Sequence, residues 1–272
     1  MLDAQGKVVR TLSSELEESP IGPEHPDWNP GSEPEADLDA DAGLHRASWD
    51  FTIDGAPYIP EAMVDTGDPH VGPGALPGEY TLRLVADGKT VTAPLRVDPD
   101  PRLKVARADQ EAEVAFLLQL RDRMSEIVRL VAQLRSVRDQ LETHDEELAE
   151  RADAAELIAA SKEVVDHLDE VERELHNPDA EVTYDILAGR DEGGAKLHSR
   201  YSFLNEAARS HPGPPTQGML EVQAQLDREL AVQRTKLEGV LGAELAKVQA
   251  LAAKLSLGYV VVPPADAAAK PR

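Results

Sequence analysis

The sequence predicts an α+β protein with two domains: a small antiparallel β-sandwich over residues 1–102 and a long antiparallel helical bundle over residues 103–263. Apolar residues alternate in short runs before residue 98, as they do in strands, and recur every three or four residues after it, as they do in helices. The proline-rich stretch 98–102 separates the two patterns, and 272 residues suffice for two domains of ordinary size. We expect residues 264–272 to form a disordered tail.

The charge of the chain restricts its partners. Lys and Arg number 28 against 51 Asp and Glu, which gives a formal net charge of −23. Nucleic acid and anionic membrane surfaces would be repelled, so we expect neither as a partner. The absence of Cys excludes disulfides and thiolate chemistry. Residues 1–12 lack the apolar core of a signal peptide, and no apolar stretch reaches the length of a membrane span.

Two short strands are expected early in the chain. Residues 7–12 follow a turn-like segment at 3–6, and only Met1 and Leu2 precede that turn, so we expect this edge of the sandwich to be truncated. Residues 44–51 alternate in polarity, as a half-buried strand does. One face of that strand would carry His45, Ala47, Trp49 and Phe51, with Trp49 in the core.

The clearest β signal is a hairpin over residues 80–97. Asp87-Gly88 can adopt the positive φ angles that a tight type I′ turn needs. Pro94 cannot donate a ladder hydrogen bond, which favours an edge position or a bulge. One face of the first strand carries Tyr80, Leu82 and Leu84, and one face of the second carries Val91, Ala93, Leu95 and Val97.

A long acidic, proline-rich loop is expected over residues 13–42. Residues 13–70 hold 15 Asp and Glu but a single Arg, and such a composition cannot offset the entropy of ordering. Asp37, Asp39 and Asp41 fit positions 1, 3 and 5 of a calcium loop. Ala42 stands where that loop needs Gly, and Ser48 where it needs a bidentate Glu. We therefore favour a solvated loop over a calcium site, and we expect no cofactor.

Trp28 lies in the same polar loop. An exposed aromatic side chain there could stack on a sugar ring or on another domain. Anchoring of the loop to the body of the protein is the interpretation that we favour, because large aromatic side chains are mostly buried.

Four helices are expected in the second part, at about 107–143, 145–176, 195–209 and 216–257. The first carries an apolar stripe with one gap at Arg138, formed by Leu120, Met124, Ile127, Val131, Leu134 and Leu141. A capping box at Thr143–Glu146 would separate the first two helices, and Thr216 would cap the last. Short connections favour antiparallel neighbours.

Three segments of the chain form a recognisable set: LDAQGKVVRTL, AGLHRASWDF and GPGALPGEYTLRLVADGKTVTAPLRVDPDPR. They resemble the Ig-like domain that follows the β-propeller in bacterial sortilin-type, BNR-repeat glycosyl-hydrolase-like proteins. The first and last helices of that family's next region are similar to ADQEAEVAFLLQLRDRMSEI and PPTQGMLEVQAQLDRELAVQ. The resemblance implies an Ig-like sandwich, an upstream propeller as partner, and export of the full-length proteins. No Ser-x-Asp-x-Gly-x-Thr-Trp box of the propeller occurs here, so no sugar-cleaving residue is carried over.

These observations favour a non-catalytic role. Neither His-Glu-x-x-His nor Gly-x-Ser-x-Gly occurs, and no His has a Glu three residues before it. We expect an accessory or interaction region that braces a propeller, in the same chain or in trans, or mediates assembly. Two alternatives stay open: an independent adaptor whose helices self-associate as a coiled coil into a homo-oligomer, and part of a glycoside hydrolase whose active site lies in the propeller.

Overall fold

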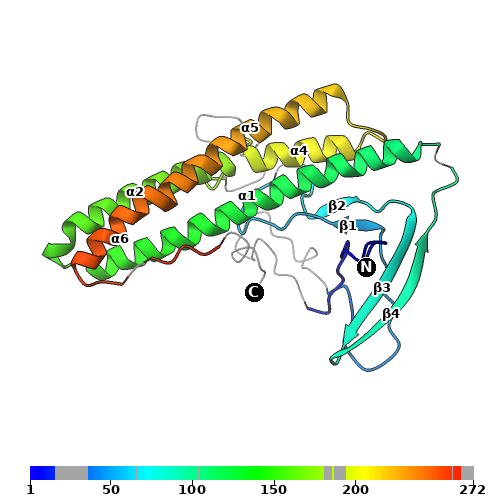
Figure 1. The fold of residues 1–272 in the computed structure, drawn as a ribbon, viewed down its shortest axis with the longest axis horizontal. Coiled ribbons are helices and arrows are strands. Elements are labelled where there is room, and N and C mark those ends of the chain that lie inside the picture. The colour runs from blue at the N-terminus through cyan, green and yellow to red at the C-terminus, as the bar shows by residue number, and fades with distance from the viewer. Residues whose placement is uncertain are drawn as a thin grey trace.

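The computed structural model describes residues 1–15, 36–64, 66–102, 104–180, 186, 194–258 and 260–264. Within these ranges the protein is a mixed α+β structure with long helices and two separate antiparallel sheets of two strands each. Figure 1 shows the helices extended along one another, with both sheets towards one end of the molecule. No described helix combines the length and the apolar character that crossing a bilayer requires.

In the described ranges the helical part has three long segments and the short helix α4. In chain order the elements are α1 (Arg107–Leu148), the 3₁₀ turn η2 (Ala152–Ala154), α2 (Ala155–Leu175), α4 (Leu197–Arg209), α5 (Gln217–Gly239), the π-helical turn η3 (Val240–Glu244) and α6 (Leu245–Lys254). In Figure 1, α1 runs away from the sheets, α2 runs back, and α5, η3 and α6 run away again as one path. Neighbouring long segments along the chain are therefore antiparallel.

The core of the helical part lies where the stripe predicts it. All six stripe residues of α1 are at most 2% exposed. The side chains that share a core with them come from the other helices: Val164, Leu168, Val171, Leu175, Leu197, Tyr201, Leu204, Ala208, Leu226, Leu230, Leu237, Leu245 and Val248. Polar contacts add to this packing, because Asp227 on α5 accepts hydrogen bonds from Tyr201 on α4 and Arg123 on α1, each at 2.8 Å.

The helix ends were predicted in part. The Thr216 hydroxyl accepts a hydrogen bond from the Met219 amide at 3.3 Å, so the predicted cap of the last helix is confirmed. The predicted break at Thr143–Glu146 is wrong, since α1 continues to Leu148. The Thr143 hydroxyl donates to the Asp139 carbonyl one turn earlier at 2.7 Å, an interaction compatible with a helix interior.

The early strands are much shorter than expected. Residues 44–51 contain no strand, and β1 covers only Thr52–Asp54. Phe51 has a φ of 62°, a left-handed conformation that cannot continue an extended strand. Residues 7–12 form only an isolated bridge, between Val8 and Leu2. Leu2 also bridges to Thr81, with the two amide–carbonyl hydrogen bonds both at 2.9 Å.

The sheet of β1 and β2 (Val71–Gly74) packs on α1. The two backbones approach so closely that a Cβ on Gly72 would lie 2.0 Å from the Ile53 carbonyl oxygen, so glycine is required there. The segment after β1 enters the helical core, where Ala56 is 0% and Ile59 2% exposed. The N-terminal part of the chain therefore contributes directly to the core of the helices.

The second sheet is a hairpin of β3 (Gly78–Ala86) and β4 (Lys89–Val97). Asp87 and Gly88 have φ angles of 50° and 70°, which confirms the predicted turn with two positive φ angles. Figure 1 shows this hairpin as a long twisted ribbon that extends away from the helices.

Candidate functional site

The first candidate site is an apolar face of the β3–β4 hairpin. In its register Tyr80 faces Leu95 and Leu84 faces Val91, and residues that face each other in an antiparallel pair point to the same side. The two apolar faces predicted for the separate strands are therefore one surface. We call it the ribbon face, and it consists of Tyr80, Leu82, Leu84, Val91, Ala93, Leu95 and Val97.

The base of the ribbon face is covered, whereas its tip is open to solvent. The Trp49 ring packs edge-on against Tyr80 with centroids 5.5 Å apart, and Phe51 lies 5.3 Å from Trp49. Trp49 is half-buried at this contact rather than part of a closed core. Towards the turn, Leu84 is 58% and Val91 64% exposed. The tip of the ribbon face therefore presents apolar side chains to solvent.

The second candidate is a buried charge cluster between α1 and α2. The Glu172 side chain is 2% exposed, and its two carboxylate oxygens accept hydrogen bonds from Arg135 and Arg138, each at 2.6 Å. Nε2 of His176 lies 3.0 Å from the same carboxylate. Burial by itself raises the pKa of Glu172, but the hydrogen bond with His176 and the two guanidinium groups lower it to about 2.

His198 on α4 extends this cluster. Burial lowers the pKa of His198 to about 4, and the charge of His176 acts in the same direction. One ring nitrogen of each imidazole is buried without a hydrogen-bond partner in the described part of the chain. Glu172 and both imidazoles are buried, so the cluster joins α1, α2 and α4 from within. The sequence signal for it was the gap at Arg138 in the apolar stripe.

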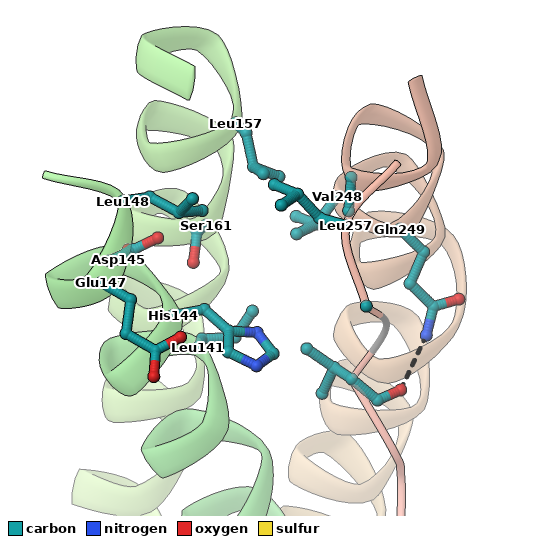
Figure 2. Close-up of a pocket in the computed structure, with 13 residues that line it drawn as sticks. Leu141, His144, Asp145, Glu147, Leu148, Leu157, Ser161, Val248, Gln249 and Leu257 are labelled. Atoms are coloured by element: carbon teal, nitrogen blue, oxygen red, sulfur yellow. Dashed lines mark hydrogen bonds between the residues drawn. The ribbon is translucent and has the colours of Figure 1, made fainter. Parts of the chain in front are cut away.

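The third candidate is a cavity of about 120 Å³ at the end of the helices farthest from the sheets (Figure 2). Its apolar walls come from α1, α2, α6 and the segment after α6: Leu141, Leu148, Leu157, Val248, Ala252, Leu257 and Val260. Its polar lining includes His144, Asp145 and Ser161. In Figure 2 the Asp145 and Ser161 side chains lie next to each other, while the His144 ring reaches from α1 towards the C-terminal segment.

The polar side of this cavity is not satisfied by the protein. Ser161 is 2% exposed, and its hydroxyl has no hydrogen-bond partner within the described ranges. The Asp145 carboxylate lies beside this hydroxyl, which favours its charged form and so lowers its pKa, although the two groups are outside direct hydrogen-bonding geometry. Burial raises the pKa of Asp145, and Ser161, Lys162 and His144 offset that rise only in part.

Three glutamines fix the segment over the cavity, residues 260–263, which we call the strap. Gln140 on α1 donates to the Val261 carbonyl and accepts from the Val261 amide, both at 2.9 Å. Gln133 on α1 donates to the last strap carbonyl at 2.7 Å, and Gln249 on α6 to the first at 3.0 Å. The strap is therefore held by its backbone, and this places one wall of the cavity.

The acidic residues for which the sequence analysis disfavoured a calcium site have partners within the protein. Asp37 accepts a hydrogen bond from the Ser13 amide at 3.1 Å, and Asp39 accepts one from the Asp41 amide at 2.9 Å. Across the described residues, no three His, Asp or Glu side chains gather closely enough to hold a metal ion. Trp28, the candidate for stacking on a ligand, lies outside the residues that the structure describes.

Comparison of the chain with protein-family models, with curated proteins and with solved structures found no match. Its function therefore has to be argued from the ribbon face, the charge cluster and the cavity themselves.

Proposed function

We propose that this chain is a non-catalytic interaction region, and that the ribbon face is its docking surface. The observation that most directly supports this proposal is the exposure of apolar side chains on one side of the hairpin, where Leu84 and Val91 are 58% and 64% exposed. The other side of the hairpin is mostly polar, with Glu79, Thr81 and Arg83 on β3. A two-stranded ribbon is marginally stable by itself, so covering its apolar side would stabilise it.

The charge of the hairpin also supports docking there. Residues 79–96 carry three cations and two anions, whereas the whole chain has a net charge of −23. The hairpin is thus the part of an acidic protein where a partner meets little repulsion. The partner that the sequence resemblance implies is a β-propeller of the sortilin type, upstream in the same polypeptide or supplied by another chain. In that arrangement the ribbon face would complete an Ig-like sandwich against the propeller.

Two valines on the hairpin provide a matched test. Val91 lies on the ribbon face and is 64% exposed, while Val85 lies on the opposite face and is 62% exposed. Isothermal titration calorimetry against a β-propeller domain of the sortilin type should detect binding to the wild type. Val91→Asp should weaken that binding at least about tenfold, whereas Val85→Asp should leave it within about twofold. Equal effects of the two substitutions, or the absence of any binding, would refute the ribbon face as a docking surface.

Self-association through the helices is the competing proposal. The six stripe residues on α1 are buried within a single chain, which leaves that stripe no apolar area for a partner helix. Light scattering distinguishes the two proposals, because a coiled-coil dimer should persist in Val91→Asp. The hydrolase alternative depends on the propeller, and a panel of glycoside substrates tests it directly.

A further inference from the structure

The cavity under the strap lies far from the ribbon face, and the docking role does not use it. Its volume of about 120 Å³ is close to that of engineered apolar cavities of about 150 Å³ that take up benzene. The cavity is partly open to solvent, so a ligand can reach it without unfolding of the helices. A single ring or a short aliphatic chain is the size of ligand that fits.

The position of the polar groups defines the chemistry of that ligand. The Ser161 hydroxyl is buried and has no hydrogen-bond partner in the part of the chain that the structure describes, so a ligand that bonds to it satisfies a group that the protein leaves unpaired. The Asp145 carboxylate lines the cavity next to this hydroxyl. Lys162 lies on the exposed side of α2, and its charge offsets the burial of Asp145 only in part, since the pKa of Asp145 stays raised. A carboxylate beside a free hydroxyl, with apolar walls behind both, is complementary to an apolar group that ends in an ammonium.

We propose that this cavity binds a small apolar primary amine, with the ammonium at Asp145 and Ser161 and the hydrocarbon part among Leu157, Val248 and Val260. The ammonium donates to the carboxylate and to the hydroxyl oxygen, and the hydrocarbon part displaces water from the apolar walls. A carboxylate ligand would instead be repelled by Asp145 and by the nearby Glu147.

Four probes with the same ring separate the contributions of charge, hydrogen bonding and the apolar ring to binding. Benzylamine carries the cation, benzyl alcohol the neutral donor, toluene only the ring, and benzoate the anion. A ligand of about eight non-hydrogen atoms in such a site binds with a Kd of about 1 mM or tighter. Methyl NMR on the full chain should show saturable shifts at Leu157 and Val248 with benzylamine. Benzyl alcohol should bind roughly tenfold more weakly, because its hydrogen bond is not assisted by charge, and benzoate should not bind.

Two substitutions that remove the same charge test the role of the carboxylate. Asp145→Asn should weaken the binding of benzylamine roughly tenfold. It should leave the affinity for benzyl alcohol within about twofold of the wild-type value. Asp166→Asn removes a carboxylate from the exposed face of α2 and should change neither affinity. Ala252→Leu, which adds bulk at the wall of the cavity, should weaken every ring probe. Circular dichroism of each variant verifies that it is folded.

Three results would overturn the proposal. One is the absence of saturable methyl shifts with benzylamine up to about 10 mM, well above the expected Kd. Another is an equal loss of amine binding in Asp145→Asn and Asp166→Asn, which would mean general attraction to an acidic protein. The third is binding of benzoate as tight as that of benzylamine. The ribbon variants Val91→Asp and Val85→Asp should bind benzylamine like the wild type, so this test is independent of the docking test.

Discussion

Arg135 donates a hydrogen bond of 2.6 Å to Glu172, a carboxylate on the neighbouring helix whose side chain is only 2% exposed. A buried ion pair adds little net stability compared with apolar packing, but removal of one partner leaves the others uncompensated. Glu172→Gln would leave the Arg135 guanidinium without its carboxylate partner, whereas Arg138 would keep Asp169, at 2.9 Å. We expect a loss of about 3–5 kcal/mol in the free energy of unfolding, measured by urea denaturation at pH 7. Glu170→Gln, on the exposed side of the same helix, should change it by less than about 0.5 kcal/mol.

The low pKa of Glu172 also predicts an acid-labile fold. A carboxyl group whose folded pKa is about 2, below its ordinary value of 4.5, stabilises the fold fully above pH 4.5. That contribution is lost as the pH falls from about 4.5 to about 2. In Glu172→Gln, the stability should therefore decline less steeply across this window than in the wild type. Parallel curves of stability against pH for the wild type and Glu172→Gln would contradict the low pKa of Glu172.

His198 should make stability depend on pH in a higher window. Its folded pKa of about 4 lies below the ordinary 6.5, so the unfolded chain binds the proton more readily. Stability should fall by about 2–3 kcal/mol as the pH drops from 6.5 to 4.5, and it should level off below about 4. In His198→Leu, the free energy of unfolding should depend much less on pH across this range. His211→Leu, at an exposed position, should retain the pH dependence of the wild type.

Leu134 should be among the least replaceable residues of α1. It is 0% exposed in the middle of the apolar stripe. Leu134→Asp removes a core side chain and buries a charge, so we expect a loss of about 3 kcal/mol or more. Val232→Asp places the same side chain at a position on α5 that is 53% exposed and should cost less than about 0.5 kcal/mol. Similar denaturation midpoints for the two variants would mean that the stripe faces solvent.

Ile59 should stabilise the helices although it lies outside them. It is 2% exposed within the helical core, so Ile59→Ala should cost about 2–5 kcal/mol. The loss should be visible in thermal unfolding followed by helical circular dichroism. Leu44→Ala truncates a side chain that is fully exposed and should leave that transition unchanged. An unchanged helical transition in Ile59→Ala would mean that the N-terminal segment does not stabilise the helical core.

Calcium should have little effect on this protein. The carboxylates of Asp37 and Asp39 accept hydrogen bonds from backbone amides, and a solvated acidic loop attracts cations only weakly. Millimolar calcium should leave the Tm almost unchanged. A rise of several degrees that Asp39→Ala abolishes would instead assign a calcium site to this loop.

The helices were largely predictable because their apolar periodicity acts locally and repeatedly. The stripe on α1 and the cap at Thr216 depend on residues within a few turns of one another. The end of α1 was not predictable in the same way. Thr143 can cap a helix or bond back to the preceding turn, and the packing of Leu148 in the core selects the longer helix.

The parts that could not be predicted depend on contacts between distant segments. Arg135, Glu172 and His198 come from three helices, and only the gap at Arg138 hinted at a polar group within the stripe. The alternation at residues 44–51 fits a strand, but these residues pair with no strand in the described part of the chain, and β1 begins only after the left-handed residue Phe51. The cavity depends on the path of the strap, which has no periodic signal in the sequence.

Because α1 is one unbroken helix, the distance between its two ends is fixed. At about 1.5 Å per residue, its 42 residues span about 63 Å. Arg107 at one end donates to the Pro77 carbonyl at the base of the hairpin, while Leu141 and Leu148 near the other end line the cavity. The length of α1 therefore sets the separation between the base of the hairpin and the cavity.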